Sequence, residues 1–98
     1  MYHAVRGTQA PFGVSTIADG IAVKEPGKLT REIIARNVAE IRLVDEGDIE
    51  QAIVMLLEIE KTLAEGAGAA PLAALIKHGE RFRGRKLGLV LSGGNIDP

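Results

Sequence analysis

A polar and glycine-rich segment, Ser92-Gly-Gly-Asn95, directly follows the compact apolar run of residues 86–91. This order of residues predicts a buried strand that ends in a tight turn. Open α/β sheets bind ligands beyond the carboxyl ends of their strands, so a hydroxyl, two glycines and an amide at this position could hold a ligand. Taken alone, the segment is equally compatible with an ordinary turn.

A second glycine-rich segment, residues 66–71, comes close to the dinucleotide-binding fingerprint. It follows a helical pattern rather than a strand, so we reject that chemistry. Small residues that allow close helix packing are the simpler interpretation. Glu65 precedes the segment, between two apolar stretches. A carboxylate at such a place could be partly buried, although exposed glutamates are the commoner case.

Several other kinds of chemistry are excluded or disfavoured. The chain has no cysteine, and its two histidines, His3 and His78, are far apart in the sequence, so we predict no metal site and two surface histidines. The only basic cluster, residues 81–86, contains Phe82 and could stack on nucleic acid. Because the net charge is −1, we expect a solvated loop there and no nucleic-acid partner.

The elements that must position these residues follow an alternating order. We predict strands at residues 20–24, 39–45 and 86–91, separated by helices. The first helix begins near Thr30 and ends near Asn37. The longest is capped by Asp45 and carries apolar residues from 49 to 63, and the third begins at Pro71 and ends at His78. The predicted fold class is therefore α/β, with about three strands alternating with three helices.

The size of the chain limits what this layout can bury. Ninety-eight residues form one small segment, 46% of them hydrophobic but only 3% aromatic, so aliphatic residues and alanine must fill the core. The longest helix is apolar on two sides, and three strands are too few to cover it and both sheet edges. We therefore expect the chain to be part of a larger assembly. No apolar run is long enough to span a membrane, and the absence of cysteine favours the cytoplasm.

Three motifs, in their order and spacing, resemble those of the pyridoxal-phosphate-dependent threonine dehydratases, with serine dehydratase and serine racemase as cousins. They are Thr16-Ile-Ala-Asp-Gly-Ile-Ala-Val23, Glu65-Gly-Ala-Gly-Ala-Ala70 and Leu89-Val-Leu-Ser-Gly-Gly-Asn-Ile-Asp97. The similarity covers essentially the whole chain and looks especially like the catabolic, short-chain branch. It implies that residues 1–98 are the C-terminal part of a catalytic domain of the tryptophan-synthase-β-like fold (fold type II), incomplete on its own.

The resemblance also implies what the chain lacks. The family binds pyridoxal 5'-phosphate through a Schiff-base lysine and a tetraglycine phosphate loop, and neither motif occurs in this sequence. The five lysines lie in unrelated contexts. We therefore expect no catalytic residue in this chain, no catalysis by the chain alone and no cofactor bound without the rest of the enzyme.

The resemblance assigns five residues to the cofactor pocket: Ser92, Gly93, Gly94, Gly20 and Glu65. Ser92 would hydrogen-bond the pyridine nitrogen. A neutral hydroxyl makes the ring a weaker electron sink than a carboxylate would, which favours elimination of a β-hydroxyl. Gly93 and Gly94 would let the backbone pass close to the ring, Gly20 would lie on the 3'-oxygen side, and Glu65 would face the same pocket.

The function implied for the parent enzyme is conversion of threonine, a small amino-acid substrate, to 2-oxobutyrate and ammonia. The alternative, based on the doubly apolar helix, is an autonomous, non-catalytic α/β protein that self-associates, and in either case we expect a homo-oligomer.

Overall fold

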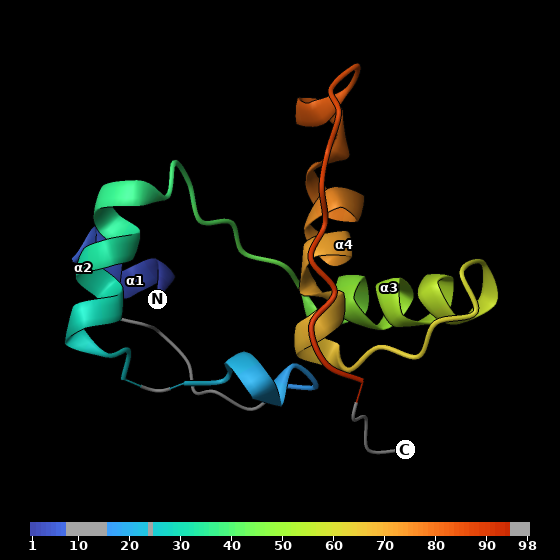
Figure 1. The fold of residues 1–98 in the computed structure, drawn as a ribbon, viewed down its shortest axis with the longest axis horizontal. Coiled ribbons are helices and arrows are strands. Elements are labelled where there is room, and N and C mark those ends of the chain that lie inside the picture. Colours follow the sequence, from blue (N-terminus) through green and yellow to red (C-terminus); the bar gives the residue numbers. More distant parts are fainter. Residues whose placement is uncertain (8–15, 24, 95–98) are drawn as a thin grey trace.

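The computed structural model describes residues 1–7, 16–23 and 25–94, and within these residues all the regular secondary structure is helical (Figure 1). The α-helices are α1 (Tyr2–Arg6), α2 (Lys28–Asn37), α3 (Glu46–Glu58) and α4 (Gly66–His78). Two short 3-10 helices, η1 (Asp19–Ile21) and η2 (Gly79–Phe82), complete the set. The extended segment after η2 runs back along α4 (Figure 1).

The predicted α/β class, with three strands, is wrong for the described residues. Residues 19–21 form η1 in place of the first predicted strand, whose residue 24 lies outside the described residues. Residues 39–45 and 86–91 are non-helical, as predicted. Among the described residues, however, no backbone hydrogen bond joins either segment to a neighbouring strand. A strand is stabilised by a ladder to a partner, so an alternating pattern without a partner gives only extended chain.

The predicted helices are confirmed in position, with corrections at their ends. The predicted end at Asn37 and the N-cap at Asp45 are correct. The apolar pattern to residue 63 overestimates α3, which ends at Glu58 with Ile59 as C-cap. Three residues after the helix, Lys61 adopts a φ of 55°. The Lys61 ammonium donates to the Glu58 carbonyl oxygen at 2.5 Å. This hydrogen bond satisfies one of the carbonyl groups that are left without a partner at the end of a helix.

Helix α4 begins five residues earlier than predicted, so that Pro71 lies inside it. Gly66, Gly68 and Ala69 all belong to its first turn and a half, and all three are buried. Glycine weakens an isolated helix. Here the low helix propensity of Gly66 and Gly68 is outweighed by close packing, because the backbone of Ile17 and of Ser92 lies against this turn.

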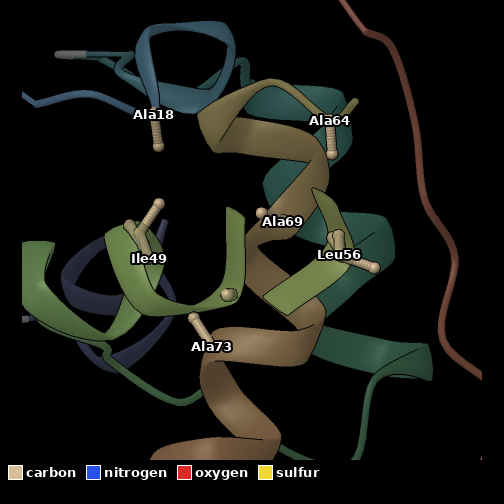
Figure 2. Packing of buried hydrophobic residues seen from close by; sticks show 7 residues of the cluster. Ala18, Ile49, Leu56, Ala64, Ala69 and Ala73 are labelled. Atoms are coloured by element: carbon tan, nitrogen blue, oxygen red, sulfur yellow. The ribbon is translucent and has the colours of Figure 1, made fainter. Parts of the chain in front are cut away.

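The core lies where α3 crosses α4, with η1 above them (Figure 2). It consists of seven buried hydrophobic residues: Ala18, Ile49, Ala52, Leu56, Ala64, Ala69 and Ala73. Figure 2 shows Ile49 pointing from α3 toward Ala18. Because five of the seven are alanines, the two elements approach closely but bury little apolar area, and we expect a small stability margin.

Helices α1 and α2 pack on each other and lie apart from α3 and α4 (Figure 1). The radius of gyration is 14.1 Å, against about 13 Å for a compact domain of this length. Many large apolar side chains are left exposed, among them Leu29, Ile59, Leu63 and Val90. Scattered apolar residues are normal on a surface, but this density is typical of a surface that contacts other protein. None of the described helices is long and apolar enough to cross a membrane.

The N-terminus of α3 offers a test of local stability. In a capping box, the Asp45 carboxylate accepts from the Asp48 backbone N–H, and the Asp48 carboxylate accepts from the Asp45 backbone N–H at 3.0 Å. The Asp45 carboxylate also accepts from Lys77 at 2.9 Å. Replacing Asp45 by alanine is expected to lower the free energy of unfolding by about 1 kcal/mol, mainly through the lost cap, since the exposed ion pair contributes little. Urea unfolding followed by circular dichroism measures it. Asp45→Asn keeps a capping side chain and should lose much less; equal losses would contradict this account.

Candidate functional site

The first turn of α4 is held between two backbone segments. A Cβ atom at Gly66 would lie 2.3 Å from the carbonyl oxygen of Ile17, and one at Gly68 would lie 2.2 Å from that of Ser92. Real Cβ atoms do not approach other atoms so closely, so both positions require glycine. The two glycines thus bring residues 17–20 and 92–94, which are more than 70 positions apart in the sequence, against one helix end.

Three of the five residues predicted for the site meet at this helix end. A Cβ atom on Gly93, whose φ is 76°, would lie 2.4 Å from Oε1 of Glu65. A Cβ atom on Gly20 would lie 3.6 Å from the same oxygen and 3.0 Å from the Cβ of Ala67. The Glu65 carboxylate, on the N-cap residue of α4, therefore lies between the two glycines. It is half-buried, as one of the two sequence interpretations allowed.

The other two predicted residues lie on the same segment as Gly93. Ser92 contacts α4 through its carbonyl oxygen at Gly68, and the residue is exposed. A Cβ atom at Gly94 would lie 3.3 Å from the carbonyl oxygen of Leu63, just before α4. An exposed serine, a carboxylate and glycine backbone thus border one small region. They could bind a flat polar ligand through a hydroxyl and closely approaching main chain.

The anchor of the segment before η1 was not found from the sequence. The Thr16 hydroxyl donates to Oε1 of Glu46, and the Ile17 N–H donates to Oε2 at 2.9 Å. The Ala18 N–H in turn donates to the Thr16 hydroxyl at 3.1 Å. Glu46, in the first turn of α3, therefore fixes the segment that carries Gly20. The two partners are 30 residues apart, and no local pattern predicts such a pairing.

A polar network at the other end of α4 also escaped the sequence analysis. His78 is half-buried, and its Nε2 lies 3.1 Å from the carbonyl oxygen of Leu43 while its Nδ1 lies 3.2 Å from Arg42. Since a carbonyl only accepts and a guanidinium only donates, this geometry has Nε2 donating to Leu43 and Nδ1 accepting from Arg42. Glu40 pairs with Arg42 at 2.8 Å and with Arg81 at 3.3 Å. His78 and Arg81 thus attach residues 40–43 to α4, a structural role.

An apolar groove of about 270 Å³ lies between α3, α4 and the extended C-terminal segment. Leu89 and Leu91 line one side, and residues of the two helices and the turn after α3 line the rest: Met55, Leu56, Ile59, Glu60 and Leu72. The groove carries one carboxylate and no other charged side chain, so it does not suit the chemistry of the site above. Lys61 and Lys77 are engaged at Glu58 and Asp45, away from that site, and the described part of the chain has no cluster of side chains suited to a metal ion.

Comparison with known proteins identifies the family. The profile of pyridoxal-phosphate dependent enzymes matches residues 1–93, nearly the whole chain. The chain belongs to this family. The resemblance to threonine dehydratases seen in the three sequence motifs is thereby confirmed.

Curated relatives similar to the chain include L-threonine ammonia-lyases and a catabolic L-threonine dehydratase. It is 49% identical over 85 residues to the L-threonine ammonia-lyase of Thermotoga maritima, covering 87% of this chain and 21% of that enzyme. It is 55% identical over 89 residues to the L-threonine ammonia-lyase of Geobacter sulfurreducens, covering 91% and 22%. For the catabolic L-threonine dehydratase of Escherichia coli the identity is 43% over 84 residues, covering 84% and 26%. The chain therefore spans between a fifth and about a quarter of these relatives.

Solved structures of the family share its backbone arrangement. A threonine deaminase from T.th. superposes with a TM-score of 0.79 at 32% identity, covering 97% of this chain and 35% of the other. The serine racemase of Dictyostelium discoideum gives 0.80 at 33%, covering 98% and 31%. The predicted fold type II neighbours are thus found, although the described residues form no sheet of their own.

Proposed function

We propose that this segment forms the pyridine-nitrogen side of the pyridoxal-phosphate pocket in an enzyme that converts L-threonine to 2-oxobutyrate and ammonia. The observation that carries the proposal is the convergence of Gly20, Glu65 and Gly93 from three distant segments. The similarity to L-threonine ammonia-lyases supports the substrate class. The proposal includes the cytoplasmic location that the cysteine-free sequence predicts.

The residues present fit one side of such a cofactor. When bound, the cofactor withdraws electrons from the amino-acid substrate. Ser92 would offer its exposed hydroxyl to the pyridine nitrogen, and Gly93 and Gly94 would let the main chain lie close to the ring. Glu65, fixed between Gly20 and Gly93, would hold the two glycine segments at a constant spacing. The phosphate and Schiff-base contacts would come from the rest of the enzyme.

The remaining chain of the enzyme would also complete the fold. Residues 39–45 and 86–91 take part in no backbone ladder within the described part of the chain, and Leu87, Leu89 and Val90 are exposed. Such segments are stabilised by pairing with neighbouring strands. We therefore propose that both segments contact the portion of the enzyme that this chain does not span.

A segment exchange tests the proposal. Residues 1–93 replace the matching part of the Geobacter sulfurreducens L-threonine ammonia-lyase, which gives what we call the hybrid enzyme. We expect it to bind pyridoxal 5'-phosphate and to release ammonia from threonine. As a control, the host enzyme with the matching part deleted should do neither. A folded hybrid enzyme that binds no cofactor would contradict the proposal.

The exposed apolar surface favours a second candidate, self-association of the 98-residue chain without catalysis. The apolar groove and the exposed Ile59 and Leu63 would be covered by a second copy. Analytical ultracentrifugation of the isolated chain is expected to give a mass that rises above 10.4 kDa with concentration. A constant 10.4 kDa at high protein concentration would remove this candidate.

A further inference from the structure

We propose that Gly68 is a positioning residue that sets the location of Ser92 in the cofactor pocket, an inference that rests on the proposed function. Gly68 is buried in the first turn of α4, and its Cα faces the backbone of residues 92 and 93. A Cβ atom there would lie 2.2 Å from the Ser92 carbonyl oxygen, 3.1 Å from the Ser92 carbonyl carbon and 3.4 Å from the Gly93 carbonyl oxygen.

The contact is between backbone and backbone, which makes it stiff. A flexible side chain could rotate away from an added methyl group, but a carbonyl group moves only with its own segment. Any side chain at residue 68 must therefore push Ser92 and Gly93 away from α4. Because Glu65, three residues before Gly68, also lies against Gly93, the displaced segment cannot slide along the helix without also moving that carboxylate.

Gly68 does not touch the proposed ligand. At saturating cofactor, where a shift of Gly93 no longer limits cofactor binding, Gly68 acts on turnover through Ser92. In the hybrid enzyme, Gly68→Ala is expected to lower kcat for threonine by about 10-fold to 100-fold, the range for a reacting group misplaced by about 1 Å. The absorption spectrum of the bound cofactor should shift in the direction given by Ser92→Ala. Gly47→Ala is the control, since Gly47 is also in the first turn of a helix but has nothing within 4 Å of its Cβ position.

A double-mutant cycle separates positioning from general destabilisation. If Gly68 acts through Ser92, Gly68→Ala should cost less than about 3-fold in kcat when residue 92 is already alanine, because little remains to be misplaced. Gly66→Ala creates an equally close contact, 2.3 Å from the Ile17 carbonyl oxygen, on the other segment. Its effect should be the same whether residue 92 is serine or alanine.

The outcomes distinguish the two proposals. If Ser92→Ala changes neither turnover nor the cofactor spectrum, the proposed function fails. If Ser92→Ala has its effect but Gly68→Ala has none, or loses the same factor in both backgrounds, the positioning role is overturned. Should Gly68→Ala fail to fold, Gly94→Ala moves the same segment more gently, with a Cβ contact of 3.3 Å to Leu63. A loss that depends on Ser92 supports the inference, and a loss independent of it overturns it.

Discussion

Replacing Ser92 by aspartate in the hybrid enzyme is expected to slow ammonia release from threonine by about 100-fold. This factor is the lower end of the rate effects that a change in protonation state has in an active site. An aspartate would hold a proton on the pyridine nitrogen through charge, whereas the serine hydroxyl is neutral and does not. In the proposed pocket, Ser92 would therefore keep the electron demand of the ring modest, which would favour expulsion of the β-hydroxyl of threonine. The absorption spectrum of the bound cofactor should change together with turnover.

The matched control for this variant is Ser92→Thr, which keeps the hydroxyl and adds a methyl group at an exposed position. It should retain turnover within a few-fold and leave the spectrum unchanged. If Ser92→Asp also left both unchanged, Ser92 would have no contact with the pyridine nitrogen. If Ser92→Thr lost as much as Ser92→Asp, space at residue 92 and not charge would explain the loss.

Replacing Gly93 by alanine is expected to weaken binding of pyridoxal 5'-phosphate by the hybrid enzyme at least about 10-fold. Two effects combine at this residue. Its φ of 76° is a conformation that costs about 1–2 kcal/mol for any residue with a Cβ. In addition, the new Cβ would lie 2.4 Å from Oε1 of Glu65 and would displace the carboxylate or the segment that carries Ser92. Titration of the apoenzyme with the cofactor measures the change.

Gly84 provides a control with the same backbone strain and no crowding. Its φ is 78°, and nothing lies within 4 Å of its Cβ position. Gly84→Ala should therefore lower the free energy of unfolding by about 1–2 kcal/mol, as strain alone does, and leave cofactor affinity unchanged. Equal losses of affinity in the two variants would mean that strain, and not the contact with Glu65, explains the effect at Gly93.

Local sequence signals predicted the end of α2, the N-cap of α3 and the end of α4, whereas α2 begins at Lys28 and not near Thr30 as predicted. Asp45, followed by acidic residues, marked the start of α3, and His78 before Gly79 marked the end of α4. These signals depend on hydrogen bonds and charges within a few positions, which the sequence displays directly. The start of α4 was missed because it depends on distant backbone at Gly66 and Gly68. The sheet was wrongly predicted for the same kind of reason. Alternating apolar residues show which face of a strand would be buried, but they do not show whether a neighbouring strand is present to pair with it.

The candidate site was reached through motifs and not through geometry. The spacing of the residues did not decide whether Ser92-Gly-Gly-Asn95 is an ordinary turn or a ligand site. It also did not show which residues Glu65 contacts. The fold supplies the missing information by placing Glu65 between Gly20 and Gly93. The support behind them, Glu46 with Thr16 and Gly68 with Ser92, joins residues at least 24 positions apart, beyond the reach of local patterns. Asn95 lies outside the described residues.

The most direct test of the pocket assignment is a crystal structure of the hybrid enzyme with pyridoxal 5'-phosphate bound. We expect the Ser92 hydroxyl oxygen to lie within hydrogen-bond distance of the pyridine nitrogen, about 2.7–3.0 Å, with Gly93 and Gly20 beside the ring and Glu65 between them. A pyridine nitrogen contacted by a residue from outside this segment, with Ser92 facing solvent, would contradict the assignment.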